Sequence, residues 1–114
     1  MKKQFRIKKS EEIKELVTKR HTVGDQYFVI YYQPRTDNTF RFAVSVNKKW
    51  GTAPERNQMK RRVRDIVSRH QEEFHRIDFL IVAKANCKGI GFEKMKESLA
   101  ELFQRLMKKE AKHE

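Results

Sequence analysis

The chain has little cysteine and no long apolar run. Cys87 is the only cysteine in 114 residues, so neither an intrachain disulfide nor a cysteine-based zinc site is possible. No run of about 18 apolar residues occurs, so insertion into a membrane is not expected. The N-terminus has cations but lacks the apolar stretch that a secretory signal needs. These absences together fit a reducing, cytoplasmic setting.

Acidic residues are also scarce relative to basic ones. Lys and Arg number 27 against 15 Asp and Glu, which gives a net charge of +12. Such a charge alone would allow RNA, DNA or an anionic membrane surface as the polyanionic partner, and no membrane is assigned. Disorder is the alternative for so charged a chain, but 38% hydrophobic content with eight Phe favours one folded domain over residues 1–114. Only the ends are excepted. The basic N-terminal arm over about 1–9 is either a second phosphate-binding arm or a free tail, and the C-terminal tail over about 108–114 is expected to fray.

Motifs for catalysis by the protein are missing. The four histidines are scattered, and the sequence has no paired-carboxylate motif, no Gly-rich phosphate loop and no His/Cys cluster. We therefore expect no catalytic residue in the protein and no small-molecule substrate.

Apolar periodicity predicts an α+β protein, built as a two-layer α/β sandwich. Along the chain we expect a helix over about 11–20 capped by Ser10, strands over 27–32 and 40–46, a helix opening at 52–54, a strand over 77–84, and a helix over 92–106. The first two strands should pair as a hairpin. The third is apolar nearly throughout and should lie at the centre of the sheet.

Basic side chains are most concentrated in residues 56–64, which hold five cations and no acid. On a helical wheel one surface about two turns long carries Arg56, Asn57, Lys60, Arg61 and Arg64, while Arg62 falls on the opposite flank. Guanidinium groups this dense repel one another unless phosphates neutralise them. The alternative is a solvated helix whose charge is softened by the acids that follow, Asp65, Glu72 and Glu73.

The neighbours of this run leave several alternatives open. Lys48 and Lys49 could grip phosphate while Trp50 stacks on a base, or the indole could fold back onto the core. Asn57 could read polar groups or join a metal shell beside phosphates, or it could be an ordinary helix-start asparagine.

The aromatic strand over 27–32 presents a similar choice. Phe28, Ile30 and Tyr32 point to one face of the strand, and Tyr27, Val29 and Tyr31 point to the other. One set should pack under helices. The other either lines an open cleft for bases of a single strand or is covered core.

The block from Ser45 to Arg64 closely resembles the signature of the bacterial ribonuclease P protein subunit. That signature reads Ser-Val-x-Lys-Lys-x-Gly-x-Ala, followed by Arg-Asn-x-x-Lys-Arg-x-x-Arg. The resemblance extends over nearly the whole chain, including the basic start over 6–9 and the strands over 28–31 and 78–84. It implies the element order αβββαβα, with an extra short strand near 21–24 and a left-handed βαβ crossover, against the usual rule.

The resemblance also implies a function. A protein of this family binds a catalytic RNA, and together they remove the 5′ leader from precursor transfer RNA. The RNA, with Mg²⁺, hydrolyses the phosphodiester, so this is an endoribonuclease whose protein alone is not expected to cleave. The protein holds the single-stranded leader in a central cleft, secures the RNA and raises its affinity for metal.

Two sets of site residues follow. The predicted RNA-binding residues are Lys48, Lys49, Arg56, Asn57, Lys60, Arg61, Arg62 and Arg64. The predicted leader-cleft residues are Ile13, Val17, Phe28, Tyr31, Lys60 and Arg64. No metal ligand is assigned except, as an option, Asn57.

Several positions depart from the family pattern. Ile13 and Val17 stand where aromatics are usual, which removes stacking from the cleft. Gln58 stands where arginine is frequent, and Arg20 replaces a usual glycine, so the turn there could differ.

Two rival functions use the same basic helix. An RNA chaperone or ribosome-associated protein would bind structured RNA without a preference for leaders. A DNA-binding protein fits less well, because a strand and a loop, rather than a helix at helix-turn-helix spacing, precede the basic helix. Competition between RNA and duplex DNA would separate these functions.

Overall fold

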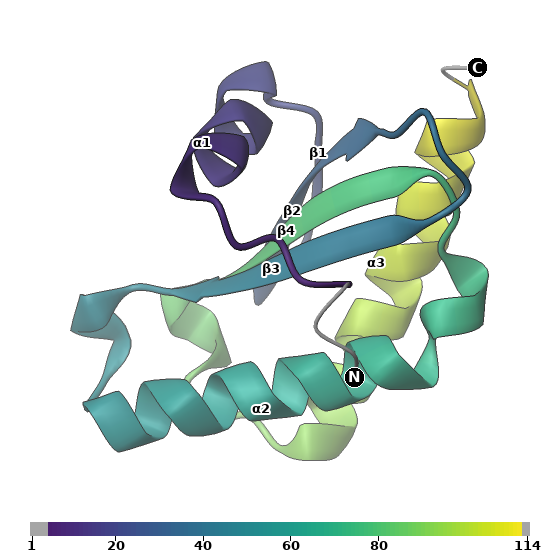
Figure 1. Cartoon of the computed structure of the whole chain (residues 1–114). Helices are drawn as coiled ribbons and strands as arrows, with labels where there is room; N and C mark the ends of the chain where they lie inside the picture. The colour runs from purple at the N-terminus through teal and green to yellow at the C-terminus, as the bar shows by residue number, and fades with distance from the viewer. Residues whose placement is uncertain (1–4, 113–114) are drawn as a thin grey trace.

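The computed structural model describes residues 5–112, and the side chains of residues 5–109. The main elements are α1 (Ser10–Lys19), β1 (Thr22–Gly24), β2 (Phe28–Pro34), β3 (Phe40–Val46), α2 (Ala53–Arg69), β4 (Ile77–Ala83) and α3 (Phe92–Lys112) (Figure 1). The described part of the chain also contains the short 3-10 turns η2 (Lys48–Trp50), η3 (Gln71–Glu73) and η4 (Ala85–Cys87). The predicted α+β class is confirmed, and the short strand expected near 21–24 is β1.

The four strands form one sheet in the order β1-β2-β4-β3. β4 runs antiparallel to β2 and parallel to β3, and it occupies the central place expected of the most apolar strand. The predicted hairpin is therefore wrong: β2 and β3 each pair with β4, which inserts between them. β3, α2 and β4 make the parallel crossover, whose left-handedness stays a prediction.

The two faces of the sheet are covered unequally. α2 and α3 lie on one face, and α1 lies over part of the other (Figure 1). Alternation along β2 sends Phe28, Ile30 and Tyr32 into the main core beneath α2 and α3. A smaller cluster under α1 is centred on Leu16 and Leu80. α2 contributes an apolar stripe to the main core: Met59, Val63, Ile66 and Val67 are all buried.

The helix ends differ in two places from what the sequence predicts. The N-cap position of α1 is Lys9, whose side chain makes no capping bond, and Ser10 is the first helical residue, so the predicted Ser10 cap is wrong. At the other end of the chain α3 continues to Lys112. The frayed tail predicted from residue 108 is thus helical over 108–112, and residues 113–114 lie outside the described part.

Arg20 ends α1 in a left-handed conformation, with φ of 54°. Its backbone N–H donates to the Val17 carbonyl oxygen at 3.3 Å. This is the geometry that glycine commonly supplies after a helix. The turn is therefore made in the usual way although its glycine is replaced, and the arginine carries the strain of a positive φ.

Arg20→Gly is expected to raise the free energy of unfolding by about 0.5–1 kcal/mol. Relief of the left-handed strain, about 1–2 kcal/mol for an L-residue, exceeds the extra entropy that glycine loses on folding. Urea denaturation measures the change. Lys14→Gly, at an exposed position inside the same helix, is the matched control and should lower stability by a similar amount. Destabilisation by both variants would contradict the strain argument.

Candidate nucleic-acid interface

The start of α2 is fixed by a reciprocal cap. The Thr52 hydroxyl accepts a hydrogen bond from the Glu55 N–H at 3.3 Å, and the Glu55 carboxylate accepts one from the Thr52 N–H at 3.0 Å. These bonds hold the pKa of Glu55 below its usual range. Pro54 sits in the first turn, where its missing N–H costs nothing. The only acid in the first turn is thus used to build the helix start.

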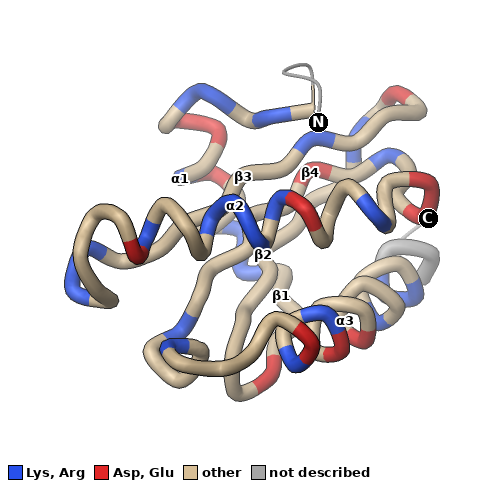
Figure 2. Tube along the Cα trace, turned by 90° about the horizontal axis from the view of Figure 1, so that it is seen from below, with Lys and Arg blue, Asp and Glu red and all other residues tan. Residues whose placement is uncertain are grey.

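The cations that follow have no acidic partner. Among the described residues, no ion pair involves any of the five cations of the run 56–64. Asp65, the nearest acid after the run, pairs with Arg69 at 3.1 Å, and Glu73 contacts His70. Figure 2 shows basic positions gathered along α2, whereas α3 mixes both signs. Two of the three acids that could have softened the charge, Asp65 and Glu73, are therefore paired with residues outside the run.

The N-terminal arm adds a further cation beside α2. The Ile7 N–H donates to the Phe42 carbonyl oxygen at 2.9 Å, and the Phe5 ring stacks on Phe40 with centroids 4.7 Å apart. Burial, and then the charge of Arg6, lowers the pKa of Arg64. Residues 5–7 are thus fixed along β3 rather than forming a free tail, while residues 1–4 of the predicted arm lie outside the described residues. The charge of Arg6 thus adds to that of Arg64, and the combined charge favours an anionic partner.

The predicted leader-cleft residues do not all come together. Ile13 and Tyr31 are half-buried, and Val17 is 41% exposed; they lie where α1 meets the sheet. Phe28 is wrong as a cleft residue: it is 0% exposed, because alternation along β2 points it to the opposite face, into the core under α2 and α3.

Lys60 and Arg64, the other two cleft residues, belong to α2 and so to the opposite side of the sheet from α1. The edge strand β3 and the arm segment paired with it lie between the two groups (Figure 1). A single strand that touches both groups must therefore cross this edge.

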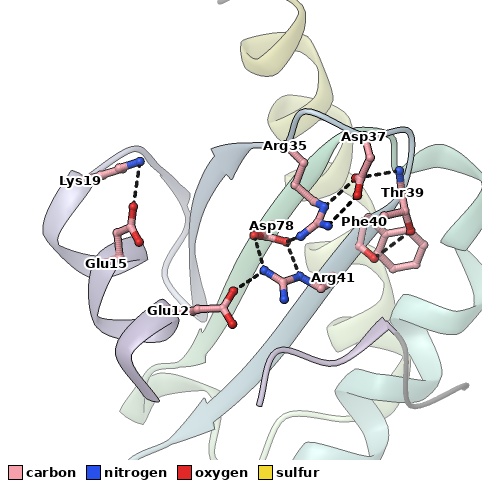
Figure 3. Close-up of polar contacts among 9 residues, drawn as sticks. All are labelled: Glu12, Glu15, Lys19, Arg35, Asp37, Thr39, Phe40, Arg41 and Asp78. Carbon is pink, nitrogen blue, oxygen red and sulfur yellow. Dashed lines mark hydrogen bonds and ion pairs between the residues drawn. The ribbon is translucent and has the colours of Figure 1, made fainter. Parts of the chain in front are cut away.

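A polar network that the sequence analysis missed ties α1 to the sheet (Figure 3). Asp78 is 4% exposed and accepts hydrogen bonds from Arg41 at 3.1 and 2.9 Å and from Arg35 at 3.0 Å. Arg41 also contacts Glu12 of α1. The network therefore fixes the position of the helix that carries Ile13 and Val17. The sequence did contain one indication of this network, because Asp78 is the only charged residue within the apolar strand over 77–83.

The outer end of this network is at the surface. Arg35 donates two hydrogen bonds to the Asp37 carboxylate, at 2.9 and 2.8 Å. These bonds lower the pKa of Asp37 to about 2. Both arginines of the network are thus committed to carboxylates and are not free for phosphate.

Trp50 is folded back, as one of the two alternatives predicts. It packs against the main core, and its Nε1 donates to the Lys84 carbonyl oxygen at 3.2 Å. Lys48 and Lys49 remain exposed in η2, and the Asn47 side chain accepts the Lys49 N–H at 2.8 Å. The lysine pair therefore faces solvent on an ordered turn, while the indole is only partly accessible.

Other cations are already engaged with the edge strand β1. Arg105 donates to the Gly24 carbonyl oxygen at 3.1 Å, and Lys109 donates to that of Thr22 at 3.2 Å. Gly24 and Thr22 belong to β1, which pairs with β2 on one side only. These α3 cations therefore satisfy carbonyl oxygens at the edge of the sheet, which distinguishes them from the cations of the run 56–64, for which no acidic partner is found in the described part of the chain.

The described residues do not form a metal site of their own. Within 5–109, no group of three or more His, Cys, Asp or Glu side chains could hold an ion. Asn57 is exposed and shares a surface hollow with Glu55 and Arg61. One amide beside a carboxylate already used as a cap does not fit Mg²⁺, which takes carboxylates together with substrate phosphates and waters.

Within the described residues, every helix is too short or too polar to cross a membrane.

Comparisons with known proteins agree with this geometry. The family model described as Ribonuclease P matches residues 1–107. A ribonuclease P protein component from Acholeplasma laidlawii is 35% identical over 116 aligned residues, covering 99% of this chain and 100% of the relative. The solved Staphylococcus aureus RNase P protein superposes with a TM-score of 0.84 at 28% identity, covering 90% and 94% of the two chains. The Thermotoga maritima RNase P protein shares the fold, with a TM-score of 0.80 at 22% identity over 88% and 96%.

Proposed function

The chain belongs to the ribonuclease P protein family and has a role in transfer RNA processing, and from that premise we propose that it clamps the catalytic RNA and the 5′ leader of precursor transfer RNA. The observation that carries the proposal is the set of unpaired cations on α2. Their charge is uncompensated within the described residues, and the helix that holds them is fixed by its cap. Phosphates supply the missing partners.

The catalytic RNA is the partner proposed for the cations of α2 and η2. Arg56, Lys60 and Arg61 lie along one surface of the helix, and Lys48 and Lys49 are exposed on the turn before it. A rigid row of cations holds phosphates in a fixed register without reading bases. It also screens repulsion between the catalytic RNA and its substrate, which is how the protein would support assembly.

The leader is proposed to contact the surface around Val17 and Tyr31. Apolar contact is what Ile13 and Val17 can offer, because neither has a ring on which a base could stack. Tyr31 supplies the one aromatic group. Lys60 and Arg64 lie on the cleft side of the α2 row, so in this proposal they contact leader phosphates where the leader crosses β3 as well as the catalytic RNA.

Bond cleavage itself is assigned to the RNA. In this proposal Mg²⁺ is held by the RNA and the substrate, and the protein residues bind and orient. The reaction is endonucleolytic hydrolysis that yields the mature 5′ end, in the cytoplasm.

The test is cleavage of a 5′-extended precursor transfer RNA at low Mg²⁺ by a bacterial ribonuclease P RNA, with and without this protein. Restored cleavage at the mature 5′ end, with no cleavage by the protein alone, would support the proposal. Binding to that RNA without any effect on cleavage would instead favour an RNA chaperone. A substrate with a shortened leader tests the leader contact separately. Its affinity for the ribonuclease P RNA should be the same with and without the protein, because the leader that the protein would contact is missing.

A further inference from the structure

A second basic groove lies on the other flank of α2. Trp50, Arg62, Lys88, Gly89 and Ile90 line it, so that three segments meet there: η2, the first half of α2 and the loop that leads from β4 to α3. Arg62 is two residues from both Lys60 and Arg64, about 200° round the helix from each. The groove is therefore separate from the surface that carries those two cations.

The cations of the groove are available for an anion. Within the described residues neither Arg62 nor Lys88 makes an ion pair, and Arg62 is half-buried whereas Lys88 is exposed. Glu55 is the acid in the groove, and its carboxylate is bound to the Thr52 N–H. Two cations against one engaged carboxylate leave the groove positively charged.

The backbone and the indole suit a flat ligand next to that charge. Gly89 has φ of 86°, and a Cβ built there would meet no atom within 4 Å, so the chain is open to close approach. Trp50 is held in place by its bond to the Lys84 carbonyl oxygen and by the core behind it, yet it still lines the groove. A fixed, partly exposed aromatic ring beside two cations is the usual means of holding an unpaired base and its phosphate.

We propose that this groove binds one nucleotide of single-stranded RNA, with the base against Trp50 and Ile90 and the phosphate between Arg62 and Lys88. The inference rests on the proposed RNA-binding function and extends it, because α2 then contacts RNA on both flanks. A duplex would offer the groove phosphates only, since its bases are stacked and unavailable to the indole.

The test uses the intrinsic emission of Trp50, the only tryptophan in the chain. The full-length protein is titrated with a short single-stranded oligoribonucleotide labelled for anisotropy, so that binding and the response of the groove are followed together. We expect saturable quenching of Trp50 by the single strand and none by an RNA duplex. In Arg62→Gln/Lys88→Gln the quenching should be lost, and the slope of log K against log salt should fall in magnitude by about 0.7, for the one single-strand phosphate that the two cations share.

The matched control is Lys94→Gln/Lys108→Gln, which removes the same charge from exposed positions on α3. It should quench as the unmodified chain does. Saturated binding without an emission change would overturn the proposal, and so would equal quenching by duplex and single strand, or undiminished quenching in Arg62→Gln/Lys88→Gln.

Failure of the groove is distinguishable from failure of the ribonuclease P role. If the protein restores precursor cleavage but Trp50 emission does not change, nucleotide binding in the groove is refuted and the ribonuclease P function is supported. If single strands quench Trp50 but cleavage is not restored, the groove binds RNA and the ribonuclease P function is refuted.

Discussion

Lys60→Gln/Arg64→Gln is expected to weaken binding to ribonuclease P RNA by about 60-fold at about 0.1 M salt. Each lost phosphate contact forgoes the release of about 0.9 counterion, which is worth nearly a factor of eight at that concentration. The slope of log K against log salt should therefore fall in magnitude by about 1.8. Filter binding or anisotropy over a salt series measures both quantities. The side chains are free to make such contacts because neither has an acidic partner among the described residues.

Position, rather than total charge, should determine that loss. Lys94→Gln/Lys108→Gln removes the same two charges from α3 and is expected to leave the slope unchanged. Circular dichroism checks that both variants keep their helix content. Equal losses in the two variants would mean that RNA senses only the net charge of +12, and the surface on α2 would have no special role.

Asp78→Asn is expected to lower the free energy of unfolding by about 3 kcal/mol. Removing one partner from a buried ion pair leaves its opposite charge uncompensated, which costs about 3–5 kcal/mol. The lower end applies because Arg35 and Arg41 keep 19% and 24% of their side-chain surface exposed. Urea denaturation gives the value, with the slope m as a check on compactness.

Asp65→Asn is the matched control for that variant. It makes the same chemical change in an exposed i,i+4 pair on α2, where the expected loss is about 0.5 kcal/mol or less. Similar small losses in both variants would show that Arg35 and Arg41 are rehydrated once Asp78 is neutral. The network would then not be what holds α1 on the sheet.

Local patterns predicted the elements well and their pairing poorly. The residues of the apolar stripe of α2 lie within a few positions of one another in sequence, so periodicity was enough to find the helix, whereas its cap of Thr52 and Glu55 was not predicted. Pairing of β2 with β4 joins Phe28 to Ala83 across most of the sheet-forming chain. No short-range signal encodes that contact, and proximity in sequence wrongly favoured a β2–β3 hairpin.

The candidate site shows the same division between local and tertiary information. The cations of α2 were found because a run without acids is visible in the sequence. Alternation separated Phe28 from Tyr31 correctly, but it could not say which face the two larger helices would cover. The partners of Asp78 come from β3 and from the segment that follows β2, and their meeting depends on the assembled sheet.

The central position of β4 has a consequence for how the protein is made. β2 and β3 are joined only through β4 in the described sheet, and β4 follows both of them in the chain. Until residues 77–83 have emerged, the two earlier strands have no common neighbour, so a nascent chain cannot close its sheet stepwise. The basic helix α2 is synthesised before β4, so its apolar stripe cannot be fully buried until β4 has emerged. The closed sheet and a correctly presented row of cations thus become available together, once β4 has emerged.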